Sequence, residues 1–130
     1  MAKVILTVDD DPVFHAALEA ILSTRYEVRR AANGTEALAS VAESHPDLIL
    51  LDVMMDHLSE GFDVARQLKG DEATRHIPIV ILSGVDDVYN VRLEIHESWI
   101  PYERFLVKPV SPEKLLATVD EVLASAVPKG

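Results

Sequence analysis

Short apolar segments of strand length alternate with segments of helical periodicity, and this alternation restricts the fold more than any other feature of the chain. The apolar segments cover residues 4–8, 48–51, 77–82 and 105–107, with a weaker one near 27–31. Continuous apolar strands separated by helices are typical of parallel strands that are buried on both faces. The pattern predicts an α/β fold: a doubly wound, five-stranded parallel sheet with right-handed crossovers and helices on both faces.

Two helix starts are recognisable from local residues. Asp11 followed by Pro12 is typical of an N-cap and the first helical position. Ser111, followed by Pro112 and Glu113, is a similar start for the last helix. The first of these gives Asp11 an ordinary structural role, but it leaves the two acidic residues before it unexplained.

Size and composition indicate one domain without a membrane segment. The chain has 130 residues, so we expect a single domain over 1–127 and a tail or the start of a linker over 128–130. No apolar run approaches the roughly 18 residues that a membrane span needs. The net charge of -10 argues against direct binding to nucleic acid or to an anionic membrane. Cysteine is absent, so cysteine usage does not indicate whether the protein is in an oxidising or a reducing compartment. A cytoplasmic location is the default expectation.

Polar residues follow four of the five predicted strands directly. Asp9 and Asp10 follow the first strand, Asp52 the third, Ser83 the fourth and Lys108 the fifth. The carboxyl ends of parallel strands meet at one edge of the sheet, where ligands bind in folds of this kind. Clustered carboxylates repel one another and lose hydration when buried, unless a cation lies among them. Because Mg²⁺ prefers such oxygen ligands, we predict a magnesium site at this edge.

Four motifs at this spacing resemble the receiver domain of two-component response regulators, the CheY-like family. The motifs are VDDDP at 8–12, DLILLDVMM at 47–55, VILSG at 80–84 and FLVKPV at 105–110. The resemblance extends from Lys3 to about Val127. It implies the flavodoxin-like strand order 2-1-3-4-5, an order for which the family is a known example.

The resemblance assigns catalytic and switch residues. It makes Asp52 the phosphoacceptor, with Lys108 and Ser83 as catalytic partners for the phosphoryl oxygens. Ser83 is also the implied switch hydroxyl, and Phe105 is the implied switch aromatic. The same resemblance predicts a cis peptide bond before Pro109.

The resemblance also defines a metal site. Asp9 and Asp10 are the implied acidic pair that holds Mg²⁺, together with Asp52 and the backbone carbonyl of Met54. The chain departs from the family in the loop after Asp52, which is one residue longer and has Asp56 where proline is usual.

The predicted function is a phosphorelay switch. We expect phosphorylation of Asp52 by a histidine kinase or a histidine phosphotransfer protein, and signalling through contact with a downstream protein. A phosphorylation-dependent dimer is a further candidate form. The chemistry would be self-catalysed phosphoryl transfer and autodephosphorylation, not metabolic enzyme turnover. Two alternatives stay open: a Mg²⁺-dependent phosphohydrolase with an aspartyl nucleophile, and a docking module that works without phosphorylation.

Overall fold

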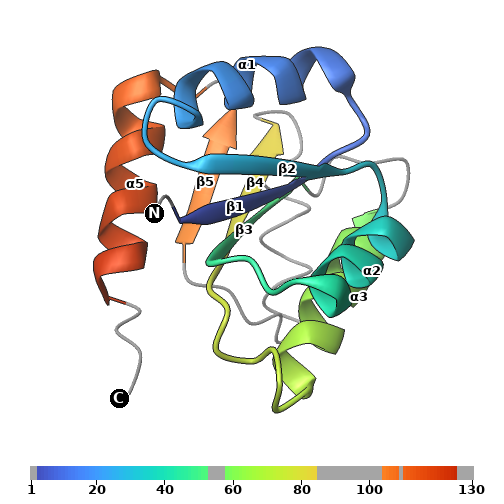
Figure 1. Cartoon of the computed structure of the whole chain (residues 1–130). Helices are drawn as coiled ribbons and strands as arrows, with labels where there is room; N and C mark the ends of the chain where they lie inside the picture. Colours follow the sequence, from blue (N-terminus) through green and yellow to red (C-terminus); the bar gives the residue numbers. More distant parts are fainter. Residues whose placement is uncertain (1–2, 53–57, 85–103, 109, 126–130) are drawn as a thin grey trace.

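Strands and helices alternate along the chain as the apolar pattern predicts (Figure 1). The structure, a computed structural model, describes residues 3–52, 58–84, 104–108 and 110–125. The elements in these ranges are β1 (Val4–Val8), α1 (Pro12–Leu22), β2 (Glu27–Ala31), α2 (Gly34–Glu43), β3 (Leu48–Asp52), α3 (Leu58–Gly70), β4 (Ile79–Gly84), β5 (Arg104–Lys108) and α5 (Pro112–Ser125).

The five strands form one sheet in the order β2-β1-β3-β4-β5, and every neighbouring pair is parallel. The predicted fold class and strand order are therefore confirmed. β1 and β3 lie in the interior of the sheet, and their apolar side chains are buried on both faces. This position explains why their sequences are continuously apolar instead of alternating.

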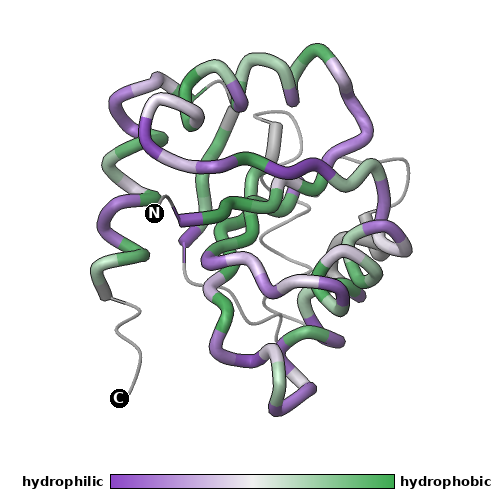
Figure 2. Tube along the Cα trace, viewed as in Figure 1, coloured by the Kyte–Doolittle hydropathy of each residue, from purple (hydrophilic) through white to green (hydrophobic). Residues whose placement is uncertain are grey.

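Helices cover the two faces of the sheet as separate layers (Figure 1). On one face Leu6 and Val8 pack with Val41 of α2 and Val64 of α3. On the other face the core side chains come from the strands and from α1 and α5, and include Ile5, Leu18, Leu50, Leu115 and Val119. The apolar residues of the strands lie between these two layers (Figure 2). Burial of these side chains from water is the main contribution to the stability of such a fold.

Both predicted helix starts are confirmed. The Asp11 carboxylate accepts hydrogen bonds from the amides of Val13 and Phe14, at 2.9 and 3.3 Å. The Ser111 hydroxyl accepts one from the amide of Lys114 at 3.1 Å. These bonds satisfy amide groups that have no partner within the helix.

The strands end later than their apolar runs. Asp52 is the last residue of β3, β4 continues through Ser83 to Gly84, and β5 includes Lys108. Backbone pairing continues past the apolar residues, so these polar residues belong to the strands and do not follow them.

Residues 77 and 78, predicted as the start of the fourth strand, precede β4. The Ile77 amide donates to the Thr74 carbonyl at 3.0 Å, as part of a turn. Pro78 has no amide hydrogen, although its carbonyl accepts from Ile49 at 3.0 Å. Among the described helices, none combines the length and the apolar character that crossing a membrane requires.

Candidate functional site

The strand register brings the acidic residues to one edge of the sheet. Val8 pairs with Leu51, so Asp9, directly after β1, and Asp52, the last residue of β3, come next along two adjacent strands. Asp52 in turn pairs with Leu82 on β4. Both carboxylates are buried, with 1% of Asp9 and 2% of Asp52 exposed. The structure therefore confirms that the first and third strands place acidic residues side by side.

Asp9 is held in an environment that disfavours its charge. Its Oδ1 accepts a hydrogen bond from the Asp11 amide at 3.2 Å, whereas Oδ2 is buried and accepts none from any residue that the structure describes. Burial raises the pKa of the Asp9 carboxyl above its usual range. Nearby Arg30 and His15 lower this pKa, and the carboxylate of Asp52 raises it. A cation beside Asp9 would relieve both the desolvation and the repulsion.

Arg30 and His15 are the basic groups nearest to Asp9. Arg30 Nε lies 3.8 Å from Asp9 Oδ1, and His15 Nδ1 lies 3.9 Å from Asp9 Oδ2. His15 Nδ1 is also 2.8 Å from the hydroxyl of Thr7, and that hydroxyl lies 3.2 Å from the carbonyl of Arg29. If the single hydroxyl hydrogen of Thr7 goes to this carbonyl, Nδ1 of His15 is the donor to Thr7.

Sequence reasoning did not find either basic group. His15 has no partner at metal-ligand spacing in the sequence, and Arg30 is separated from Asp9 by 21 residues. The register of β1 and β2, which pairs Thr7 with Arg30, was the missing information. The alternation of side chains along β2 would have placed Arg30 on one of the two faces of the sheet. It could not have predicted that Arg30 contacts Asp9.

The residues fit a hard divalent cation that keeps part of its water shell. Asp10 follows Asp9 and is exposed. No group of three or more acidic, histidine or cysteine side chains that could hold a metal occurs among the described residues. Mg²⁺ binds through one or two carboxylates and several waters, so it does not need such a group. The orphaned Oδ2 of Asp9 supplies a buried anionic ligand, while Met54 lies outside the described residues.

The other predicted site residues lie on β4 and β5 or beyond the described ranges. Ser83 pairs with Val107, and Lys108 pairs with Gly84, so both backbones lie at the edge that contains Asp52. The description of these two residues covers the backbone and not the side chain. Pro109, and with it the predicted cis bond, lies outside the described residues. Phe105 is partly buried against the core cluster that includes α3 residues.

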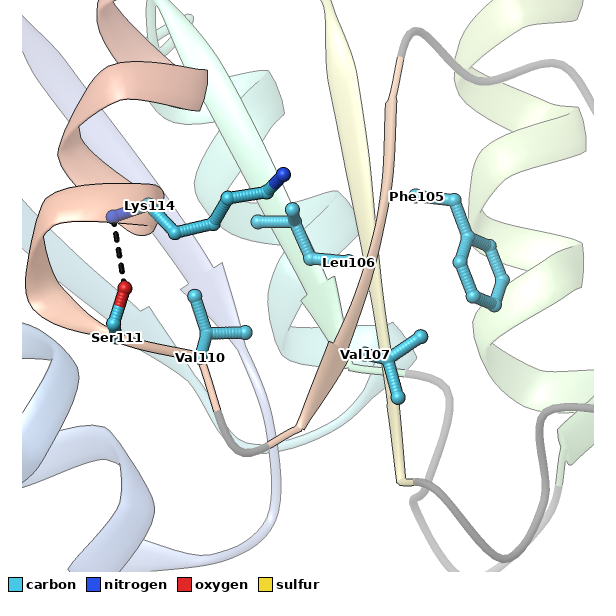
Figure 3. A pocket seen from close by; sticks show the side chains of 6 residues that line it. All are labelled: Phe105, Leu106, Val107, Val110, Ser111 and Lys114. Atoms are coloured by element: carbon cyan, nitrogen blue, oxygen red, sulfur yellow. Dashed lines mark hydrogen bonds between the residues drawn. The ribbon is translucent and has the colours of Figure 1, made fainter.

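A pocket lies beside β5 and the start of α5 (Figure 3). Phe105 projects from one side of β5, whereas Leu106 lies on the other side with Lys114 (Figure 3). The lining residues are Phe105, Leu106, Val107, Val110, Ser111 and Lys114. Phe105, the predicted switch aromatic, is therefore one of the residues that line this pocket.

Comparison with known proteins identifies the family. The model of the response regulator receiver domain matches residues 5–120, which is most of the chain. The chain belongs to the response regulator receiver domain family. This membership places it in two-component signalling and agrees with the resemblance carried by the four motifs.

Individual relatives of this receiver domain differ in length. Response regulator PleD of Caulobacter vibrioides is 43% identical over 92% of this chain, but the chain spans only 26% of PleD. Protein PilH of Pseudomonas aeruginosa is 36% identical, and the match covers 92% of this chain and 97% of PilH. A solved receiver domain of a signal transduction histidine kinase from Syntrophus aciditrophicus is 32% identical, with a TM-score of 0.82, covering 99% of this chain and 95% of that one. The same domain type thus occurs in similar proteins both nearly alone and as part of a longer chain.

Proposed function

We propose that this receiver domain accepts a phosphoryl group on Asp52 from a phosphohistidine of a histidine kinase or phosphotransfer protein. An oxygen of the Asp52 carboxylate attacks the phosphorus, and a phosphorus–oxygen bond forms as the phosphorus–nitrogen bond breaks. The donor imidazole leaves with the bonding electrons and takes up a proton from solvent. The main support is the position of Asp52, which ends the central strand β3 beside a second buried carboxylate.

Asp9, Asp10 and Asp52, with the carbonyl of Met54, are the proposed ligands of Mg²⁺. When bound, Mg²⁺ would neutralise these carboxylates and the charge that develops on the phosphoryl oxygens. Asp9 supports this assignment because its Oδ2 is buried without a hydrogen bond from the described residues. Lys108 and Ser83 would contact the remaining phosphoryl oxygens with an ammonium and a hydroxyl group.

The proposed output is a change in a protein-binding surface. An aspartyl phosphate adds negative charge at the carboxyl edge of the sheet, which shifts a two-state equilibrium of neighbouring segments. Partners would be the phosphodonor protein and a downstream protein, with a phosphorylation-dependent dimer as one further form. The chemistry is limited to self-catalysed transfer and autodephosphorylation, so the domain acts as a switch and not as a metabolic enzyme.

Incubation with acetyl phosphate and Mg²⁺ tests this proposal. Intact-protein mass spectrometry should show one added phosphoryl group, which is absent from Asp52→Asn and when EDTA removes Mg²⁺. Asp63→Asn is a matched control, because Asp63 is exposed on α3 and pairs with Arg66 at 2.5 Å. Equal labelling of Asp52→Asn and the wild type would contradict the proposal. Repeated turnover of a phosphomonoester such as p-nitrophenyl phosphate would instead indicate a phosphohydrolase.

A further inference from the structure

The side chain of Arg30 contacts both the backbone and the side chain of Asp9. The Nη2 atom of Arg30 donates a hydrogen bond to the backbone carbonyl of Asp9 at 3.3 Å. Its Nε lies 3.8 Å from Oδ1 of the same residue, which is close enough for an ion pair but too long for a hydrogen bond. Asp9 is therefore paired with a cation that it does not hold tightly.

The sheet fixes this contact. Arg30 lies on the edge strand β2, in register with Thr7, and the Asp9 amide donates to the carbonyl of Ala31 at 3.0 Å. Its neighbour Arg29 reaches toward a different element, because its Nη2 donates to the Ser44 carbonyl after α2 at 3.0 Å. Successive side chains on a strand point to opposite faces, so the two arginines have separate partners.

The pairing is asymmetric in exposure. The Arg30 side chain is 30% exposed, whereas that of Asp9 is 1% exposed. The guanidinium can thus regain water if another cation takes its place beside Asp9, but the carboxylate cannot. Arginine stays protonated at all ordinary pH values, so its charge is present whether or not a metal is bound.

We propose that Arg30 is the resident counter-cation of Asp9: it stabilises the metal-free protein and lowers the affinity of the site for divalent cations. The inference rests on the cation site of the proposed function and adds a residue that sets its affinity. A divalent cation that binds Asp9 must either tolerate the positive charge of Arg30 nearby or displace it, and both oppose binding. Arg30 is a positioning residue in this scheme, because it acts on the ligand and not on the phosphoryl group.

Mg²⁺ titrations of four proteins, followed by calorimetry, test the inference. Arg30→Gln should bind Mg²⁺ about tenfold more tightly than the wild type at low ionic strength. Arg30→Lys, which keeps the charge, should stay close to the wild type. Arg29→Gln is the matched control and should differ from the wild type by less than about twofold. Raising the salt from about 0.05 M to 0.5 M should reduce the advantage of Arg30→Gln, because salt screens a partly exposed charge.

Thermal unfolding gives an independent readout. Without divalent cations, Arg30→Gln should melt below the wild type, because Asp9 loses its counter-cation. With saturating Mg²⁺ the increase in its Tm should exceed that of the wild type, whereas loss of a purely structural arginine would leave the two increases equal.

Unchanged or weaker Mg²⁺ binding by Arg30→Gln, while the wild type binds, would overturn the inference and leave the proposed function intact. If neither Arg30→Gln nor the wild type binds Mg²⁺, the cation site itself is wrong and the inference falls with it. Binding by Arg30→Gln alone would support the inference.

Discussion

At the scale of single residues, Asp9 lowers the stability of the metal-free fold, a cost that the proposed cation site would offset. A buried carboxylate with one orphaned oxygen costs free energy that a neutral side chain of the same shape would not. The basic groups near it lie at 3.8 and 3.9 Å, so they compensate only part of this cost. A residue in such a setting is typical of a functional position and not of one selected for packing.

We therefore predict that Asp9→Asn is more stable than the wild type in EDTA at neutral pH, by about 1–2 kcal/mol in the free energy of unfolding. Asparagine keeps an oxygen for the Asp11 amide, and Arg30 is exposed enough to be solvated without its partner. Urea denaturation with and without Mg²⁺ measures the effect, and added Mg²⁺ should stabilise the wild type but not the variant. A variant less stable than the wild type in EDTA would show that the charge of Asp9 contributes favourably to folding.

The neighbouring Asp11 has a different role, which local sequence was sufficient to predict. Its carboxylate caps α1, so Asp11→Ala should lower the free energy of unfolding by about 1 kcal/mol. Asp11→Ser should recover most of this loss, since a serine hydroxyl also accepts from the first helical amides. Calorimetric titration of Asp11→Ser with Mg²⁺ provides the check on function, and its affinity should stay within about threefold of the wild type. A larger loss of affinity would make Asp11 a fourth acidic participant in the proposed site, beside Asp9, Asp10 and Asp52.

At the scale of elements, a polar cluster connects the turn between α1 and β2 with α5. Asp120 of α5 accepts a hydrogen bond from the Tyr26 hydroxyl and forms an ion pair with Arg25. Burial and the hydrogen bond to Asp120 raise the pKa of Tyr26 to about 12. The cluster joins residues 94 positions apart in the chain, so it links α5 to the turn that precedes β2.

This cluster predicts a stability difference that depends on alkaline pH. Tyrosine ionises near pH 10 when unfolded and near 12 in the fold, so the unfolded state releases its proton first. The contribution of Tyr26 to the free energy of unfolding should therefore be fully present below pH 10. It should fall by roughly 1–3 kcal/mol as the pH rises toward 12. Tyr26→Phe should be less stable than the wild type at neutral pH, by about 1–2 kcal/mol in the free energy of unfolding. This difference should shrink as the pH rises from 10 toward 12. Urea denaturation at several pH values measures it, and a constant difference would contradict the assignment.

Sequence reasoning succeeded where the signal is local and failed where it depends on register. Apolar runs and caps such as Asp11 and Ser111 predicted the strands, the helix starts and the edge where Asp9 and Asp52 meet. The pairing of Arg30 with Asp9 and of Tyr26 with Asp120 could not be predicted, because each depends on how two distant elements are aligned. The polar strand ends were missed for a related reason, since backbone pairing at Asp52 and Ser83 leaves no apolar signal in the sequence.

At the scale of the whole molecule, β4 and β5 connect Asp52 with the pocket beside α5. Asp52 pairs with Leu82, the next residue Ser83 pairs with Val107, and Ile81 pairs with Phe105. Phe105 is partly buried and lines the pocket (Figure 3). An inward movement at Ser83 would reach Phe105 across a single pair of strands.

The last prediction follows this route. A hydroxyl at Ser83 that bonds to the aspartyl phosphate would leave space in which the Phe105 ring becomes more buried. Full burial of an aromatic side chain contributes about 1.5–3 kcal/mol, so even part of it shifts a two-state equilibrium about tenfold. Phenylalanine has no hydroxyl with which to contact a partner, so the switch would work by packing alone, and Phe105→Tyr should be tolerated.

Amide hydrogen exchange in β5 and α5, compared before and after phosphorylation, measures this response. On phosphorylation, the protection of these amides from exchange should change in the wild type and in Phe105→Tyr. Ser83→Ala should still be phosphorylated, though more slowly. The exchange of its β5 amides should change little on phosphorylation, because the variant has no hydroxyl at residue 83 to bond to the phosphate and draw β4 inward. If Ser83→Ala shows the full change in β5, the route through Ser83 is wrong, and the signal must leave Asp52 through the acidic loop that follows it in the sequence.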